Sequence, residues 1–346
     1  MAGSDDELDP TTGTIYFIRE GDFNGNPISN FVKIGLTKLD RSPQDRQKDL
    51  KTGNPRELYV YRAVPVPFVR EIETALRYEF MPQHVYLEWH EFAPSSERTL
   101  DDAIAACERL AAEFAGYTEI ASESQRLKTV MPNGNSVPTS SEAEKWKHEF
   151  LLHHEIVALQ EKAKAFRRET VVAAHEQGER LPAGASVSQS PRNTYDWPAF
   201  ELKFPEIYRM HLKPSWKQNF EVSGARLKAT KSSFQEHPLV TSLSKEISEY
   251  QRQLAAVTSE APYDEYSKPH RQWKRILQMS EFSKTRKRIA RCHLMALCGE
   301  ASGIEDVCTW QREQSEPRLD TKTILKSHPD LAKQVLIDST TVTTVE

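Results

Sequence analysis

The sequence predicts an α+β N-terminal domain, a small three-stranded antiparallel sheet flanked by helices, followed by a mainly α-helical C-terminal region. Two observations carry this prediction. Three runs of β-branched and aromatic residues occur early in the chain, at 14–18, 31–36 and 58–64, and such runs favour strands. Beyond residue 141, apolar residues recur at steps of three and four, which is the period of one face of a helix.

Turn and capping residues set the order of the elements in the N-terminal domain. Residues 24–27 read Asn-Gly-Asn-Pro, a turn that would join the first two strands into an antiparallel hairpin. Ser42 and Pro43 begin a helix, because serine suits the N-cap and proline suits the first helical position. A second helix is expected over 69–80, on the spacing of its apolar residues. A short extended segment at 86–92 and a third helix from about residue 96 complete the domain.

Composition divides the chain into five segments. Residues 1–12 are acidic and are expected to form a flexible tail, and 13–120 form the domain described above. Residues 121–140 are polar, with two prolines, and are interpreted as a linker. Residues 141–338 are expected to form a mainly helical targeting or interaction domain that opens with a long helix over 141–177, and 339–346 a second flexible tail. No internal repeat is evident in the sequence.

Composition and charge exclude several classes of protein. Hydrophobic residues make up 38% and charged residues 28% of the 346 residues, as in globular domains. No apolar run approaches the roughly 18 residues of a membrane-spanning helix, and the acidic N-terminus does not resemble a secretory signal. We therefore expect a cytoplasmic protein without a membrane partner. The four cysteines lack the spacing of zinc ligands.

Short motifs within residues 13–92 occur in the order that is typical of a known nuclease family. The motifs are Thr14-Ile15-Tyr16, Val32-Lys33-Ile34-Gly35, Asp45-Arg46, Thr52-Gly53-Asn54-Pro55, Glu73 and Glu88-Trp89. In this pattern the chain resembles the GIY-YIG nuclease superfamily, in the branch named after a bacteriophage open reading frame and a meiotically up-regulated gene. Two positions depart from the family. Lys33 replaces the second tyrosine of the family name, and Arg77 stands where the branch often has a histidine.

The resemblance implies a site for hydrolysing phosphodiester bonds, with Tyr16, Lys33, Arg46 and Glu73 as its catalytic residues. Glu73 would hold Mg²⁺ (or Mn²⁺), since one carboxylate and water molecules can bind this ion beside a phosphate. Arg46 would supply a permanent forked charge at the scissile phosphate. Tyr16 and Lys33 would deprotonate the nucleophile, which requires surroundings that lower their pKa. Alone, each residue also has an ordinary interpretation as a packing or surface residue, and Glu88 is as easily a cap or bridge as a functional group.

Charge is distributed unevenly along the chain. Residues 14–92 contain as many basic as acidic residues, whereas 261–293 contain nine Lys or Arg and three Asp or Glu. A basic helix suits a phosphate backbone, so this stretch is predicted to bind nucleic acid; the alternative is a helix facing solvent or an acidic partner. The residues expected to make the contacts are Lys284, Arg286, Lys287, Arg288 and Arg291.

These observations predict a Mg²⁺-dependent endonuclease that hydrolyses phosphodiester bonds of DNA, with RNA left open as a substrate. A nuclease domain joined to an unrelated helical region resembles anti-phage defence and mobile-element proteins, in which the helical region directs the target or the trigger. That region could also contact a partner protein or a second copy of the chain. A restriction-type enzyme would need base contacts, which the sequence does not reveal. The alternative from another class is a non-catalytic nucleic-acid-binding or interaction protein that keeps the nuclease fold.

Overall fold

The computed structural model describes residues 8–22, 24–51, 56–86, 88–181, 184–225, 234–256 and 263–345. It is an α+β structure in which every named pair of neighbouring strands is antiparallel. The expected fold class is therefore confirmed at this level. The Thr52–Pro55 motif and Leu87 lie outside the described residues. Within them, no helix is both long and apolar enough to cross a membrane.

The N-terminal sheet has five strands, so the expectation of three was wrong. Its order is β3-β1-β2-β5-β4. The three longer strands match the apolar runs of the sequence: β1 (Gly13–Gly21), β2 (Pro27–Lys38) and β3 (Glu57–Val66). The extra two, β4 (His84–Tyr86) and β5 (Trp89–Glu91), come from the short extended segment. Three residues are too few to show a period of two, so pairing alone makes them strands: β5 pairs with β2, through Phe31 and Lys33, and β4 pairs with β5.

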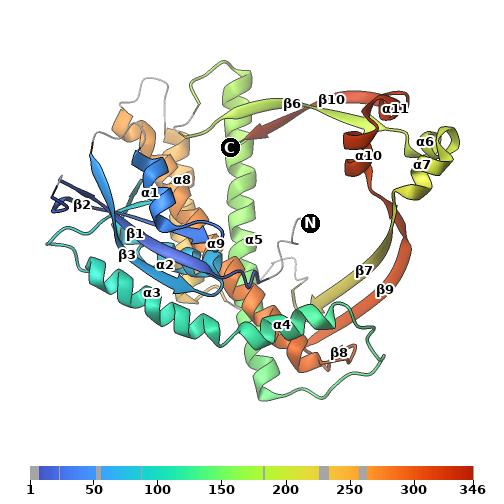
Figure 1. The fold of residues 1–346 in the computed structure, drawn as a ribbon, viewed down its shortest axis with the longest axis horizontal. Coiled ribbons are helices and arrows are strands. Elements are labelled where there is room, and N and C mark those ends of the chain that lie inside the picture. Colours follow the sequence, from blue (N-terminus) through green and yellow to red (C-terminus); the bar gives the residue numbers. More distant parts are fainter. Residues whose placement is uncertain are drawn as a thin grey trace.

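Helices cover both faces of this sheet. Alternate residues of β1 point to opposite sides: Ile15 and Phe17 join the large core with α2 (Val69–Glu79), whereas Tyr16 and Ile18 pack near Leu50 of α1 (Pro43–Lys51). This alternation follows from the pleat of a strand. A single 3-10 turn (Met81–Gln83) leads from α2 into β4, and α3 (Leu100–Ala115) lies beside the sheet (Figure 1).

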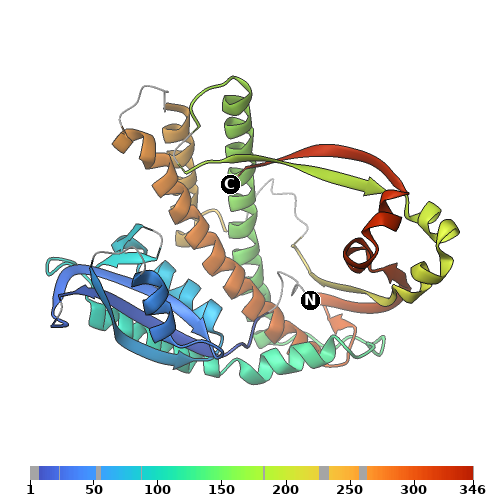
Figure 2. The same ribbon diagram turned by 45° about the horizontal axis from the view of Figure 1, so that its top comes forward.

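Three long helices form the body beside the sheet: α5 (Ser141–Glu176), α8 (Pro238–Ala256) and α9 (Tyr263–Cys298). Helix α9 packs against both α5 and α2 (Figure 2). The helical body and the sheet therefore share one continuous apolar core. That core includes Ile289 and Leu294 of α9 together with Ile15 and Phe17 of β1. Part of the expected linker is helix α4 (Thr118–Leu127). Of the expected N-terminal tail, Leu8 is buried in the same core.

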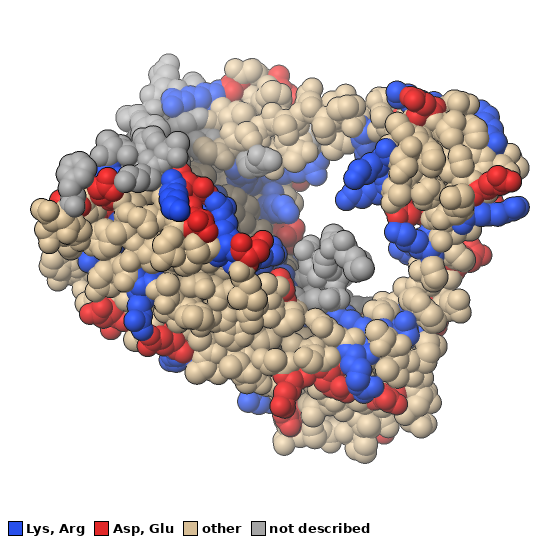
Figure 3. Space-filling model, in the orientation of Figure 1, with Lys and Arg blue, Asp and Glu red and all other residues tan. Residues whose placement is uncertain are grey.

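The C-terminal half contains an arm built largely from strands, where mostly helical structure was expected. Two long antiparallel ribbons, β6 (Val187–Tyr195) with β10 (Leu336–Val345) and β7 (Leu212–Val222) with β9 (Cys308–Leu319), leave the body and meet at a helical tip. The tip comprises α6 (Trp197–Lys203), α7 (Pro205–Met210), α10 (Thr321–Ser327) and α11 (Pro329–Lys333). Strand β8 (Gly303–Ile304) extends the second ribbon. Most of the expected C-terminal tail belongs to β10. Figure 3 shows an open gap between arm and body.

The arm contains an internal repeat, although none is evident in the sequence. Residues 195–212 and 319–336 each run from the end of a strand through two short helices into the next strand. Asp196 and Asp320 occupy equivalent N-caps and accept hydrogen bonds from the backbone three residues on. Phe200 and Ile324 are equivalent core residues of the tip. The first strand of each repeat pairs with the last strand of the other, an arrangement of approximate two-fold symmetry. The two segments share so few identical residues that the composition and periodicity of the sequence did not reveal the repeat.

Candidate active site

Tyr16 and Arg46 meet on the face of the sheet that α1 covers. Tyr16 lies opposite Gly35 in the β1–β2 register, and a Cβ atom at Gly35 would clash with the tyrosine hydroxyl, so glycine leaves room for the ring. Ser42 and Asp45 cap the start of α1 reciprocally, with the Ser42 hydroxyl donating to Asp45 at 2.7 Å. This cap places Arg46, which is hydrogen-bonded to the Tyr16 hydroxyl.

The surroundings of Tyr16 do not favour a phenolate. Burial raises the pKa of Tyr16 above its usual value of about 10, although the hydrogen bond from Arg46 opposes this shift. Its hydroxyl is therefore a donor and acceptor that orients Arg46, and the lowered pKa that a tyrosine base requires is not present in the metal-free protein.

Lys33 belongs to a line of alternating charges on the same side of the sheet. Its Nζ lies 2.7 Å from Oε2 of Glu88. The other oxygen of Glu88 lies 3.3 Å from Nη2 of Arg77, and the same Arg77 nitrogen lies 3.0 Å from Oε1 of Glu73. Lys33 is buried, and its strand partner in β5 is Trp89, the neighbour of Glu88. The extra strand β5 thus holds Glu88 against Lys33.

Glu73 is the most perturbed carboxylate of this group. Burial raises the pKa of Glu73 to about 7, and repulsion from Glu88 adds to this, while the attraction of Arg77 and Lys33 opposes it. For Glu88 burial also acts to raise the pKa, but the hydrogen bond from Lys33 and the charge of Arg77 outweigh it and hold that pKa below its usual range. The pKa values of these two neighbouring carboxylates therefore shift in opposite directions, as is common at functional sites.

The charged line opens into a cleft of about 980 Å³ between the N-terminal domain and α9. Seven of the residues that line the cleft are Lys or Arg and two are Glu, so the cleft is strongly positive. The cations come from both walls: Lys33, Arg46 and Arg77 from the N-terminal domain, and Lys268, Arg271, Lys274 and Arg275 from α9. A cleft with this charge attracts phosphate groups.

The five cations predicted from the sequence lie further along α9 and do not line this cleft. Each is partly buried and has another contact: Arg286 bonds Glu113 at 3.2 Å and Lys284 bonds Glu281 at 2.7 Å. Lys287 lies over the Phe150 ring and Arg291 over the Phe220 ring. Arg288 has its own partner and acts on the buried Glu71. Four of the five therefore contact elements packed against α9, and the pair of Lys284 lies within α9 itself.

The cations that do line the cleft belong to the same basic stretch, but the sequence did not distinguish them from the others. Lys268, Arg271 and Arg275 follow the i, i+3, i+7 spacing of one helical face, and all three are exposed. The sequence therefore contained a signal for the cations that face the cleft, namely this helical spacing. The density of basic residues alone favoured the cluster at 284–291 instead. Arg77, which was noted only as a departure from the family, joins both carboxylates of the site.

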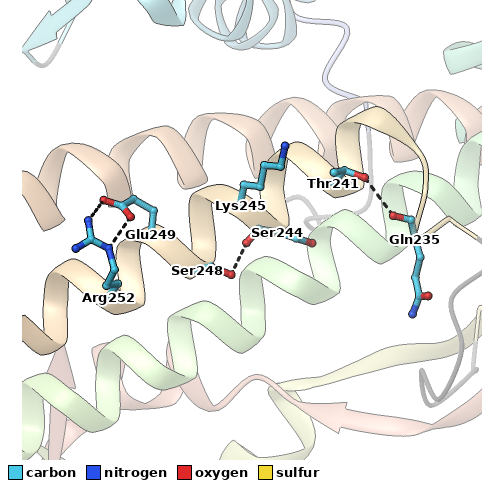
Figure 4. A pocket seen from close by; sticks show the side chains of 7 residues that line it. All are labelled: Gln235, Thr241, Ser244, Lys245, Ser248, Glu249 and Arg252. Carbon is cyan, nitrogen blue, oxygen red and sulfur yellow. Dashed lines mark hydrogen bonds and ion pairs between the residues drawn. The ribbon is translucent and has the colours of Figure 1, made fainter.

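A second pocket lies along α8 and Figure 4 shows its lining. It is smaller, about 460 Å³, and Glu249 and Arg252 within it are paired with each other. Gln235, Thr241, Ser244 and Ser248 bond mainly to helix backbone or to each other. Its contacts are those of an ordinary helix surface, and it lacks the aligned acid and base groups of the cleft.

Comparison with known proteins does not assign the chain. No protein-family model matches it, and neither does any curated protein or solved structure. Across the described part of the chain, no three or more His, Cys, Asp or Glu side chains gather into a group that could hold a metal ion. A Mg²⁺ site that rests on one carboxylate and water molecules differs from such a cluster, and Glu73 remains the candidate ligand.

Proposed function

We propose that this protein is a metal-dependent endonuclease of the GIY-YIG type that cleaves nucleic acid in the cleft between its N-terminal sheet and α9. One observation carries the proposal. The four residues that the sequence motifs single out come from four separate elements, and the structure brings them to one charged corner of the cleft. Structural surface residues have no reason to gather in this way beside a positive cavity.

Arg46 is the residue that would bind the scissile phosphate. It lines the cleft, its guanidinium is oriented by the Tyr16 hydroxyl, and about a third of its side chain is exposed. A guanidinium can donate two parallel hydrogen bonds to phosphate oxygens. Arg77 lines the cleft as well, and it could turn from Glu73 and Glu88 toward a phosphate.

Glu73 fits the expected role of metal ligand. It is a carboxylate that is mostly buried next to the cleft, and its raised pKa means that it favours a cation to balance its charge. Mg²⁺ (or Mn²⁺) held there would neutralise charge on the phosphate and lower the pKa of a bound water molecule. Because only the ionised carboxylate binds a metal ion, the affinity of Glu73 for that ion rises with pH.

Lys33 and Glu88 would manage the proton of the nucleophile. While Lys33 is paired with Glu88 it donates a hydrogen bond and cannot accept a proton. A phosphate that enters the cleft competes with Glu88 for Lys33, which frees a carboxylate oxygen to accept a hydrogen bond from the attacking water. Glu88 then takes the proton while Lys33 donates to the phosphate, so the two residues act together in general-base catalysis.

The proposal is tested by incubating the full chain with supercoiled plasmid in Mg²⁺ or in EDTA. We expect nicking in Mg²⁺ that EDTA abolishes and that Glu73→Ala eliminates. Glu79→Ala is the matched control, because Glu79 lies on the same helix but pairs with Arg98 and Arg109 outside the cleft. Nicking by Glu73→Ala at the rate of the control would contradict the assignment of the metal site.

One observation favours the alternative, a non-catalytic nucleic-acid-binding protein. Arg77 bridges Glu73 and Glu88 and so already places a positive charge beside the expected metal ligand. If the protein is non-catalytic, Arg77→Ala would still not nick plasmid, and Mg²⁺ would not raise the thermal stability of this variant. If the site is catalytic, removing Arg77 should strengthen Mg²⁺ binding, because a competing cation is lost. Calorimetric titration of Mg²⁺ into the two proteins separates these outcomes.

A further inference from the structure

We infer that the cleft accepts a single strand of nucleic acid, with its backbone along α9 and its bases against the opposite wall, and that it does not accept a double helix. This inference rests on the proposed function for the location of the scissile phosphate. The evidence is the chemistry of the two walls and the way in which α9 is fixed.

One wall of the cleft is a row of exposed cations on α9. Lys268, Arg271 and Arg275 lie on one helical face, with Lys274 beside them. From Lys268 to Arg275 the helix rises about 10 Å. That is roughly the length of three stacked nucleotides at about 3.4 Å each. The row can therefore follow a backbone for a few phosphates leading to Arg46.

The other wall offers contacts for bases, which a double helix would keep hidden. Met81, Pro82 and Val85, from the 3-10 turn and β4, line the cleft together with the imidazole of His84. The Val85 side chain is 45% exposed. An apolar strip beside a basic row is the pattern by which proteins bind unstacked bases and the backbone of single strands.

Helix α9 is fixed across the site and cannot act as a groove-reading helix. The Tyr78 and Phe282 rings stack with centroids 4.2 Å apart, and the α9 residues Ile289 and Leu294 belong to the core of the sheet. Helices α5 and α8 pack on it as well. A major groove about 12 Å wide admits one helix, so a helix flanked by three others cannot enter it. Moving α9 aside would expose the shared core.

The test measures binding by the full chain in EDTA, where no cleavage occurs, so that it does not depend on catalysis. The probes are labelled oligonucleotides of about 12 residues: oligo(dT), oligo(U), and a blunt duplex of the same length. We expect both single strands, or one of them, to bind at least about tenfold more tightly than the duplex. The two single strands distinguish a DNA site from an RNA site.

Variants locate the strand in the cleft. Arg271→Ser with Lys274→Ser should reduce the slope of log affinity against log salt by about 1.4, because each phosphate contact contributes about 0.7 for single strands. Lys162→Ser with Lys164→Ser, two exposed lysines of α5 away from the cleft, should leave the slope unchanged. Val85→Ser should weaken single-strand binding by about threefold with no change of slope.

The outcomes separate the two proposals. Equal or tighter binding of the duplex, or an unchanged slope in the α9 variant, overturns the single-strand inference and leaves the nuclease assignment intact. Failure of all three probes to bind also overturns it. Single-strand binding that follows the expected variant pattern supports the inference, even if Mg²⁺ then produces no cleavage, in which case the proposed catalytic function is what fails.

Discussion

Replacing Glu73 by Gln should stabilise the metal-free protein at high pH while it abolishes metal binding. Burial raises the pKa of Glu73 from 4.5 to about 7, so the folded protein holds this proton more tightly than the unfolded chain does. The contribution to stability is full below pH 4.5 and is lost as pH rises through 7. A shift of this size corresponds to about 3 kcal/mol, at 1.36 kcal/mol for each pKa unit. Glutamine has the same shape and no proton to lose.

The assay is urea unfolding in EDTA at several pH values between 4.5 and 8. We expect the unfolding free energy of Glu73→Gln, minus that of the natural protein, to increase by about 3 kcal/mol across this range. Only the change of this difference with pH is used, so any loss of stability that is the same at every pH, such as that from weakening the Arg77 contact, cancels. Glu79→Gln is the matched control for loss of a carboxylate on the same helix. A difference that does not vary with pH, or that only follows the control, would refute the conclusion that burial keeps Glu73 protonated near neutral pH.

Three further predictions test other parts of the structure. Arg46→Ala should lower the cleavage rate by about 10²–10³-fold with little change in melting temperature, as for loss of one transition-state donor. Arg46→Lys should recover part of that rate, since lysine keeps the positive charge and loses only the forked geometry of the guanidinium. Equal rates in both variants would exclude phosphate binding by Arg46. Arg286→Ser should lower the melting temperature, because Glu113 loses its ion pair across to α9 and keeps only Tyr117 and Arg109, while leaving the salt slope of oligonucleotide binding unchanged. The opposite result would restore this residue to the nucleic-acid interface. His90 is fully buried, and burial, with repulsion from His84, lowers its pKa to about 4. The unfolding free energy of the natural protein, minus that of His90→Phe, should therefore fall by about 3 kcal/mol between pH 6.5 and 4, and a difference that does not vary with pH would contradict this.

The cleft explains how a chain with a net charge of −4 could bind nucleic acid. Positive charge is concentrated where two separate parts of the chain face each other. Local fields of this kind govern binding more than the total charge does. The arm has a different character, since its repeat builds a symmetric tip with its own small core.

The sequence alone determined the local elements and the candidate residues of the site. The apolar spacing over 69–80 predicted α2, and Ser42 with Pro43 predicted the start of α1, because these signals act over a few residues. The motifs also singled out Tyr16, Lys33, Arg46 and Glu73 without any information on their positions in space. Each of these inferences depends on neighbours in the chain.

Only the tertiary structure decided what those residues face. Strand β5 exists because it pairs with β2, and β4 because it pairs with β5. The arm repeat is visible because its two halves pair with each other. The choice between the two ends of the basic stretch depended on which helical face meets the sheet, about 200 residues away in sequence. The pKa of Glu73 depends on burial beneath that assembly. A contact between distant segments is set by the packing of the whole core, and no local pattern encodes it.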